Sequence, residues 1–415
     1  MVPKLRFPEF LDVGEWEFVP LNKLARRCTQ RNRSGAIIRV LTNSAEYGVV
    51  DQRDYFDKDI ATQGNLENYY VVDKGDYVYN PRISVTAPVG PISKNNVSTG
   101  VMSPLYSVFR FDSNDNDFYA HYFKTTGWHQ YMRQASSTGA RHDRMAITND
   151  DFMAMPLPVS TPEEQQKIAD CFSSIDELIT LESQKLDTLK RHKKGLMQQL
   201  FPAEGETVPR LRFPEFRGAK KWQRMRLEEI STFHKGKGIA KADIAPNGKN
   251  LCIRYGELYT TYGEVIDKII SKTNLQSKDL FLSCRNDVLV PSSGETRQDI
   301  AKASCVMVDD VALGGDLNII RSTENGIFLS YLLNGSCSKE IARIAQGDTV
   351  VHLYASQLKL LVVAIPDLAE QQKIADCLGS LDDVIAMQAR KVDALKTHKK
   401  GLMQQLFPRM DEVGA

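Results

Sequence analysis

The stretch HKKGLMQQLFP occupies residues 192–202 and occurs again, letter for letter, at residues 398–408. The two copies are offset by 206 residues, the difference between 398 and 192. This period is far longer than the roughly 20–50 residues that separate the units of solenoid proteins. The repeated stretch therefore indicates that a module of domain size is encoded twice.

The same offset recurs near the start of each module. VPKLRFPEF at residues 2–10 matches VPRLRFPEF at residues 208–216. EQQKIADC at residues 164–171 is repeated at residues 370–377. Because the offset stays constant from one end of the module to the other, the two halves have matched lengths.

The halves run over roughly residues 1–205 and 207–408. Their interiors, residues 28–155 and 234–362, show no similarity that can be followed by eye. Like flanks therefore bracket unlike interiors. This pattern indicates a shared frame that holds two different domains.

The flanks carry a helical pattern. Over residues 164–200 and 370–406, apolar side chains recur at steps of three and four. A stripe of period 3.5 over about five heptads predicts a coiled-coil seam, and each helix would be about 55 Å long. We expect the seam to contain Ile168, Phe172, Ile175, Ile179, Glu182, Leu186 and Leu189 in the first helix, and Ile374, Leu378, Leu381, Ile385, Gln388, Val392 and Leu395 in the second.

The nearest partner for each stripe is the stripe of the other helix. We expect an antiparallel pair about a pseudo-twofold axis, with Glu182 and Gln388 close to that axis as a polar pair that fixes the register. Cysteines placed at positions 182 and 388 should then form a disulfide. Efficient trapping only between matching helix ends would contradict this arrangement.

Both interiors have the composition of mixed, β-rich domains. β-branched and aromatic runs, separated by Gly and Asn-Pro turns, predict strands at residues 69–72, 77–79, 105–109, 287–290, 304–308 and 317–320. Short helices are expected at residues 117–125 and 328–333. The predicted fold is α+β, with two globular mixed α/β domains separated by two long antiparallel coiled-coil helices. The predicted segments are a first domain at 1–159, a first helix at 160–204, a second domain at 205–365, a second helix at 366–409 and a tail at 410–415.

Composition sets limits on partners and compartment. The chain has 415 residues, a formal net charge of +1 and seven cysteines without a C-x-x-C pair. The net charge alone gives no argument for nucleic acid, so a basic surface would have to be local. The cysteine pattern is typical of a reducing cytoplasm, and no signal peptide or membrane-spanning run is apparent. We expect a cytoplasmic protein without a membrane partner.

Catalytic motifs are missing from the sequence. There is no G-x-x-x-x-G-K-[ST] loop for a nucleotide and no H-E-x-x-H pair for a metal. YNPR at residues 79–82 is similar to the Asn-Pro-Pro-aromatic motif of amino-methyltransferases, but Arg82 replaces the second proline. A strand-ending turn is the simpler interpretation. We therefore expect no catalytic residue and no metal ligand in this chain.

The repeated flanks resemble those of one family. The duplicated helix ending in KKGLMQQLFP and the LRFPEF lead-in are similar to the specificity (S) subunit of type I restriction–modification systems. So are GDYVYNP at 75–81 and SPLY at 103–106 in the first interior, and RYGELY at 254–259 and LGGDLN at 313–318 in the second. The resemblance covers essentially the whole chain.

The resemblance implies a non-catalytic subunit with two target recognition domains. Each domain would bind one half of a bipartite, asymmetric target in double-stranded DNA. The helices would set the gap and dock two methyltransferase (M) subunits, and two motor–nuclease (R) subunits would complete the restriction complex. S-adenosylmethionine would belong to the M subunits, and ATP with Mg to the R subunits.

Polar loops in each interior supply side chains suited to base edges and phosphates. In the first interior we expect Arg82, Ser84, Thr86, Lys94, Asn95, Ser137, Thr138, Arg141 and Arg144 to face DNA. In the second we expect Arg254, Tyr259, Tyr262, Ser293, Glu295, Arg297, Gln298, Thr349 and His352.

Two other functions remain open at this point. One is a self-sufficient DNA methyltransferase, which would transfer a methyl group from S-adenosylmethionine without partners. The other is a coiled-coil scaffold that binds only proteins. DNA binding with sequence preference would separate the second from a specificity subunit.

Overall fold

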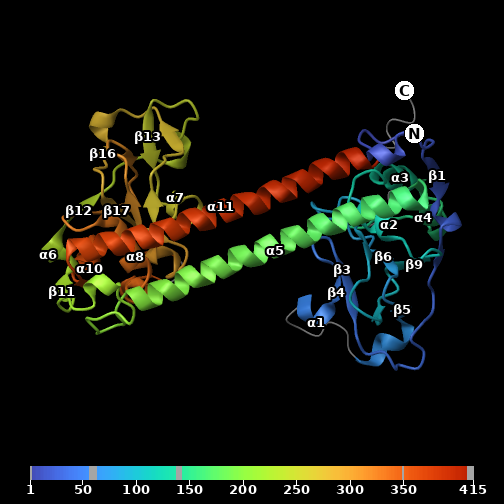
Figure 1. Ribbon diagram of the computed structural model, residues 1–415, viewed down its shortest axis with the longest axis horizontal. Coiled ribbons are helices and arrows are strands. Elements are labelled where there is room, and N and C mark those ends of the chain that lie inside the picture. The colour runs from blue at the N-terminus through green and yellow to red at the C-terminus, as the bar shows by residue number, and fades with distance from the viewer. Residues whose placement is uncertain (1, 56–62, 137–142, 348–349, 409–415) are drawn as a thin grey trace. The chain divides into compact units, whose positions relative to one another are not determined.

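The computed structural model describes residues 2–55, 63–136, 143–347 and 350–408. The chain divides into two compact units (Figure 1): unit 1 contains residues 1–182 and 391–415, and unit 2 contains residues 183–390. Each unit therefore holds the beginning of one long helix and the end of the other. The predicted domain limits cut the chain differently, and they stay a prediction.

The two long helices are α5 (Pro162–Leu200) and α11 (Leu368–Leu406). Thr161 Oγ1 accepts a hydrogen bond from Glu164 N, and Asp367 Oδ1 accepts one from Glu370 N, so a side chain caps the first turn of each helix. Each helix ends directly before a Phe-Pro pair, where proline prevents continuation. No helix among the described residues has an apolar stretch long enough to cross a bilayer.

Unit 1 is built on a four-stranded antiparallel sheet in the order β2-β9-β6-β7. These strands are β2 (Ala25–Arg27), β9 (Ser107–Phe111), β6 (Tyr77–Tyr79) and β7 (Ile92–Lys94). Three antiparallel pairs surround the sheet: β1 (Glu17–Pro20) with β10 (Pro156–Val159), β3 (Leu41–Ser44) with β4 (Gly48–Asp51), and β5 (Tyr70–Val72) with β8 (Gly100–Met102). The short helices are α1 (Gln52–Tyr55), α2 (Asp117–Tyr122), α3 (His129–Ala135) and α4 (Asn149–Met153).

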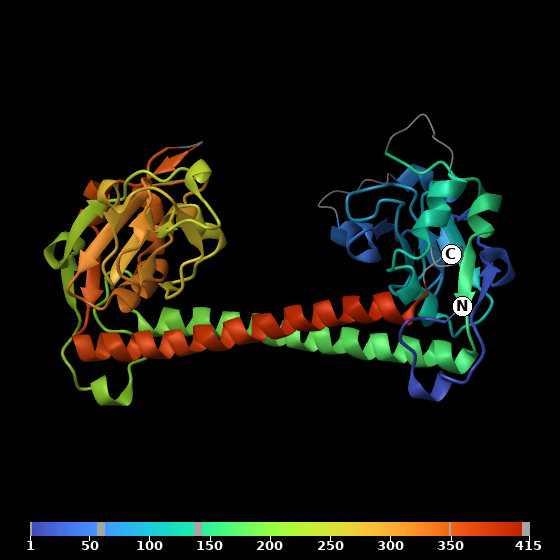
Figure 2. The same cartoon turned by 90° about the horizontal axis from the view of Figure 1, so that it is seen from above.

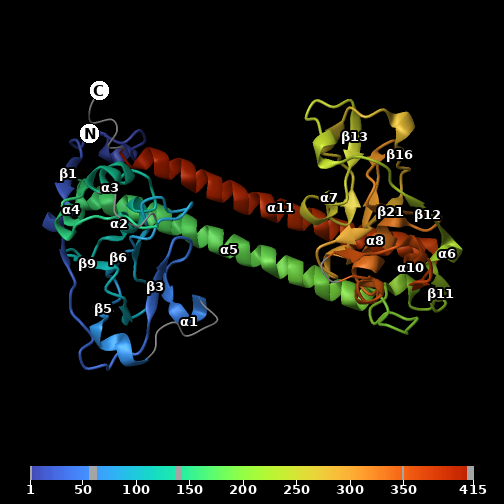
Figure 3. The same cartoon turned by 180° about the vertical axis from the view of Figure 1, so that it is seen from behind.

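Unit 2 has a five-stranded sheet in the order β12-β21-β17-β19-β14. These strands are β12 (Ser231–Lys235), β21 (Leu317–Ser322), β17 (Asp287–Pro291), β19 (Ser304–Val306) and β14 (Val265–Ile266). A second sheet contains β15 (Ser271–Thr273), β13 (Asn250–Ile253), β20 (Ala312–Leu313) and β16 (Phe281–Leu282), and two further pairs join β11 (Gln223–Arg226) to β23 (Val362–Ile365) and β18 (Ser293–Gly294) to β22 (Val351–His352). The helices are α6 (Leu227–Ile230), α7 (Glu257–Thr260), α8 (Gly326–Asn334), α9 (Ser338–Ile344) and α10 (Ala355–Lys359). Helix α8, labelled in Figure 3, packs on β17 and β19.

The end of each long helix belongs to the core of a unit. In unit 1, Phe407 stacks on Phe172 with ring centroids 5.7 Å apart, and it also contacts Phe118 of α2. In unit 2, Phe201 contacts Trp222 edge-on and Phe328 at a tilt, with ring centroids 6.3 and 5.5 Å apart. The apolar residues of the duplicated LFP ending are therefore buried anchors.

Within each unit, α5 and α11 run antiparallel (Figure 2). In unit 1, Lys399 binds Asp176 and Lys391 binds Glu182. In unit 2, Lys193 binds Asp382, the pair that the 206-residue offset predicts from Lys399 and Asp176. These ion pairs occupy the breaks in the apolar stripes.

The predicted seam is the inward face of the helices. Each of its residues is buried or half-buried, from fully buried Phe172 and Leu378 to half-buried Ile179 and Leu395. Neighbouring Leu181 and Met387 are more than half exposed. Glu182 and Gln388 belong to different units, so their pairing stays a prediction. The α+β class, the internal repeat and the two long helices are confirmed.

Candidate nucleic-acid interface

The central strands of the two units begin in the same way. In unit 1, Asp76 is buried, and its carboxylate accepts hydrogen bonds from Arg110 Nε and Nη2 at 2.6 and 3.0 Å. In unit 2, buried Asp287 accepts two bonds of 2.8 Å from Arg321. Arg110 and Arg321 lie on the neighbouring strands β9 and β21. The same ion pair between a buried aspartate and a partly exposed arginine thus joins the same strand pair in both units.

The turn before each central strand is also shared. Asp76 Oδ2 accepts a hydrogen bond of 2.8 Å from Asp73 N, and Asp287 Oδ2 accepts one of 2.8 Å from Cys284 N. The intervening Gly75 and Asn286 both have positive φ, +95° and +80°. Glycine and asparagine are the residues that tolerate this conformation best. The two interiors therefore share this turn and strand pair, as expected of two mixed β-rich domains, although their sequences do not resemble each other.

Beyond β6, the chain of unit 1 is held in a fixed turn. Asn80 Nδ2 donates to Asn43 O at 3.0 Å, and Asn80 Oδ1 accepts from Arg82 N at 3.1 Å. Gly90, with φ of +81°, lies against the backbone of Asn80 so closely that a Cβ would overlap its carbonyl oxygen. The YNPR motif is thus a strand-ending turn.

This turn pairs with a segment from the other end of the domain. Arg82 and Arg144 form an antiparallel bridge. Met145 N donates to Pro81 O at 2.9 Å, and Ile83 N donates to Asp143 O at 3.0 Å. Two arginines separated by 62 positions, the difference between 144 and 82, are therefore opposite one another on a short ribbon.

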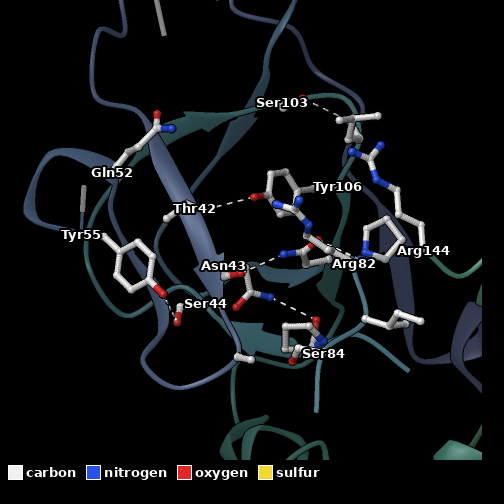
Figure 4. A pocket seen from close by; sticks show the side chains of 16 residues that line it. Thr42, Asn43, Ser44, Gln52, Tyr55, Arg82, Ser84, Ser103, Tyr106 and Arg144 are labelled. Atoms are coloured by element: carbon white, nitrogen blue, oxygen red, sulfur yellow. Dashed lines mark hydrogen bonds between the residues drawn. The ribbon is translucent and has the colours of Figure 1, made fainter. Parts of the chain in front are cut away.

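The ribbon borders a cavity of about 540 Å³ (Figure 4). In Figure 4, Tyr55 and Ser44 lie on one side, and Arg82, Arg144 and Tyr106 lie on the other. Buried Asn43 forms part of the wall, and its Oδ1 has no hydrogen-bond partner among the described residues. A donor on a bound molecule would satisfy it. The wall combines polar and apolar side chains, and none of the described residues that line it carries a carboxylate.

Three of the predicted residues of unit 1, Arg82, Ser84 and Arg144, line this cavity. Thr86 and Lys94 border a second cavity of about 470 Å³, where Lys94 binds Asp117 at 2.7 Å. The prediction for Asn95 is wrong, because this residue is fully buried and its amide donates to the carbonyls of Asp73 and Ser98. Ser137, Thr138 and Arg141 lie outside the described residues.

Unit 2 has a ribbon at the corresponding place. Ser293 of β18 pairs with His352 of β22, directly beyond the central strand β17. Tyr259 Oη donates to Ser293 O at 2.7 Å, and burial raises the pKa of this phenol above its ordinary value. The His352 ring stacks on that of Tyr354, with centroids 6.2 Å apart. Predicted residues Tyr259, Ser293 and His352 are therefore brought together.

The other predicted residues of unit 2 have different surroundings. Exposed Arg297 donates to Ala345 O at 3.2 Å, beyond the C-terminal end of α9, and so acts as a cap. Tyr262 Oη accepts from Ile270 N, and half-buried Arg254 has an Nε without a partner among the described residues. Glu295 and Gln298 are exposed in the loop after β18. Thr349 lies outside the described residues.

Several residues at these places were not predicted from the sequence. Asn43, Tyr55 and Tyr106 line the cavity of unit 1, and Tyr354 lies beside the ribbon of unit 2. Polar residues inside the β3 sequence LTNS were the available signal for Asn43. The pattern Gly/Asn-Asp followed by a run of buried residues was the signal for the shared turn, but it is short and easily overlooked.

The family is decided by a comparison with family models. The type I restriction modification DNA specificity domain matches the chain twice, at residues 15–191 and 219–397. The chain belongs to this family. The two copies of the specificity domain coincide with the two halves defined by the repeat.

Curated relatives carry the same family name. The chain is 23% identical over 291 residues to the type I restriction enzyme MjaVIII specificity subunit of Methanocaldococcus jannaschii, a match covering 66% of this chain and 65% of the relative. The MjaIX specificity subunit of the same organism is 23% identical over 330 residues, which cover 77% of this chain and 74% of the relative. The putative MjaX subunit is 21% identical, and 61% of its length is matched. The chain thus matches somewhat less than two thirds of the MjaVIII and MjaX subunits.

Two solved structures share the fold. The type I restriction–modification S subunit from M. genitalium has a TM-score of 0.60 at 14% identity, covering 99% of this chain and 100% of that one. A chain from a study of complex assembly and conformational transition of the type I R-M system has a TM-score of 0.57 at 16% identity, covering 95% and 98%. At this level of identity, the similarity describes the fold of the specificity domains.

Proposed function

We propose that this chain is the DNA sequence-recognition subunit of a type I restriction–modification complex. Each unit reads one half of a bipartite target in double-stranded DNA. The observation that carries the proposal is the double match to the specificity domain, on two units that share a scaffold and differ in the residues at the ribbon. Different residues at equivalent places favour two different half-sites, and hence an asymmetric target.

The proposal assigns the chemistry to partner subunits. Two methyltransferase subunits bind S-adenosylmethionine and methylate adenine, and two motor–nuclease subunits use ATP and Mg. This chain supplies no catalytic group, and it acts in the cytoplasm, where the DNA is accessible. Linking two domains makes the second binding event intramolecular, so two weak half-site contacts become one selective one.

The direct test is a map of methylated adenines. The full chain is expressed with its methyltransferase subunits in a host that lacks adenine methylation, and the genome is sequenced for N6-methyladenine. We expect one motif with two unlike halves at a fixed gap. A palindromic motif, or methylation without sequence preference, would contradict the proposal.

Two assays separate the alternatives. A self-sufficient methyltransferase would transfer tritium from labelled S-adenosylmethionine to DNA when the purified chain is tested alone, and we expect no transfer. A protein-binding scaffold would leave the methyltransferase complex without preference for the mapped motif over a scrambled duplex. We expect a preference that disappears when either half of the motif is scrambled.

A further inference from the structure

We propose that base identity is read at the ribbon in each unit, and that Arg82 and Arg144 of unit 1 read guanine. This inference rests on the proposed function and deepens it, because it names the residues that determine specificity. Ser293 and His352 are the corresponding pair in unit 2. Of the residues expected to face DNA, these four are the ones that contact base edges.

The equivalence of the two ribbons follows from the scaffold. Asp76 precedes Arg82 by six positions, and Asp287 precedes Ser293 by six positions. Both aspartates are the buried partners of an arginine on the next strand. Arg82 pairs with Arg144, and Ser293 pairs with His352. In each unit, the second residue belongs to a segment much later in the chain. The frame is therefore the same, and the side chains that it presents are different.

The place has the rigidity that selective recognition requires. The Arg82 backbone is fixed by Asn80 and by the bridge to residue 144, next to a tight contact between Gly90 and Asn80. A side chain carried on a fixed backbone loses less conformational entropy on binding and reaches one base rather than several. Side chains on a fixed ribbon are thus better suited to recognise base edges than side chains at the tip of a free loop.

The two arginines are also available. Within residues 2–55, 63–136 and 143–182, no hydrogen bond to the Arg82 guanidinium is present, and Arg144 has only a 3.7 Å approach to Asp143. Other cations are engaged: Lys94 binds Asp117, Arg110 binds Asp76, and Arg297 caps α9. Among the described residues, no side chain occupies the guanidinium donors of Arg82, and Arg144 has only the distant approach to Asp143.

The chemistry of the pair selects guanine. A guanidinium donates two parallel hydrogen bonds to O6 and N7 of guanine in the major groove, the most common specific contact between proteins and DNA. A serine and a histidine cannot reproduce this planar pair of donors. The half-site read by unit 1 therefore contains guanine opposite the ribbon, and the half-site read by unit 2 depends on another base there.

The test uses the full chain in complex with its methyltransferase subunits and the duplex defined by methylation mapping. We expect Arg82→Ala to weaken binding roughly 5- to 150-fold and to abolish discrimination at one guanine of one half-site. Replacing that guanine with 7-deazaguanine, which lacks the N7 acceptor, should weaken binding of the unaltered complex and cause no further loss with Arg82→Ala. Arg144→Ala should behave in the same way at a neighbouring position.

A gain-of-function variant complements the losses. Ser293→Arg with His352→Arg should create a preference for guanine in the other half-site. Arg26→Ala, at an exposed arginine of β2 that binds Asp112, is the matched control and should leave specificity unchanged. Because Arg82 is exposed, its removal should leave the thermal unfolding of the chain unchanged.

Contrary outcomes are distinguishable. Equal weakening on every sequence, with a shallower salt dependence, would identify Arg82 and Arg144 as phosphate contacts and overturn the inference. Loss of discrimination in both half-sites, or in neither, would overturn it as well. If the unaltered complex shows no sequence preference, the proposed function itself fails.

Discussion

Glu164 illustrates how a duplicated residue acquires different surroundings. It is fully buried and accepts hydrogen bonds from Arg6 Nε and Nη2 at 2.6 and 2.7 Å, from Trp16 Nε1 at 3.0 Å, and from Ser160. Its counterpart Glu370 keeps the arginine bonds, from Arg212 at 2.8 and 2.6 Å. The position equivalent to Ser160 is a proline in the second half, and Trp222 Nε1 has no partner among the described residues.

These contacts make the stability of unit 1 depend on pH. Burial acts to raise the pKa of Glu164, but the hydrogen bonds and the charge of Arg6 outweigh it and lower the pKa below its ordinary value of 4.5. A group with a lowered pKa contributes stability above its unfolded pKa, and this contribution is lost as the pH falls through the folded pKa. Glu164→Gln should therefore cost about 3 kcal/mol at pH 7 and progressively less below pH ~4.5.

Urea unfolding followed by tryptophan fluorescence, at several pH values between 7 and 3, measures this difference. Glu163→Gln, at the exposed neighbouring position, is the control and should be neutral. A cost for Glu164→Gln that does not change with pH would show that the carboxylate charge is unimportant.

The buried aspartates of the central strands support a second prediction at this scale. Removing the aspartate deletes its charge-assisted hydrogen bonds to the arginine and its bond to the turn amide, whereas the arginine is more than a third exposed and keeps contact with water. We expect a cost of about 2 kcal/mol. Asp76→Ala should destabilise unit 1 and Asp287→Ala unit 2, each by a similar amount. Calorimetry of the two variants, with exposed Asp115→Ala as control, checks this. A large effect at only one position would contradict the shared scaffold.

At the scale of elements, the breaks in the helix seams are the informative feature. Leucine or isoleucine would complete each stripe, yet Lys399 and Lys193 occupy corresponding positions and bind Asp176 and Asp382. An ion pair within an apolar seam restricts register, because a shifted helix would leave a half-buried lysine without its carboxylate. In unit 2, Tyr331 Oη donates to the same Asp382 at 2.5 Å and ties α8 to the helices.

A charge exchange tests this register in unit 1. Lys399→Asp should destabilise the unit by about 2 kcal/mol, because it places two carboxylates together in a half-buried site. Adding Asp176→Lys should restore more than half of the loss, although Lys124, 4.0 Å from Asp176, will oppose the new lysine. Thermal unfolding of both variants measures the effect, and Asp187→Lys on the exposed face of α5 is the control. Absence of rescue would contradict the antiparallel pairing.

At the scale of the whole molecule, charge limits how the chain holds DNA. Fifty-three basic and 52 acidic residues nearly cancel. Each phosphate contact releases counterions, so the steepness with which affinity falls with salt counts the contacts. The isolated chain should therefore show a shallower salt dependence than its complex with methyltransferase subunits. Filter binding between 50 and 200 mM salt measures the two slopes; equal slopes would mean that this chain makes the phosphate contacts alone.

In the interiors, contacts between residues distant in the sequence could not be predicted. Nothing in the sequence indicates that Asp76 and Asp287 have the same role, because each binds an arginine 34 positions further along the chain. Asn95 was misplaced for a similar reason. Its composition suits a surface loop, but its amide satisfies backbone carbonyls in the interior.

The sequence by itself determined the duplication, the two long helices and the residues along their seams, because helical periodicity and repeated letters are local properties that need no knowledge of distant contacts. Only the tertiary structure decided that both interiors share one scaffold. It also decided that Arg82 pairs with Arg144 in unit 1 and that Ser293 pairs with His352 at the equivalent place in unit 2. These backbone pairs join segments that are far apart in the chain, and their formation is governed by packing and hydrogen bonding across the fold.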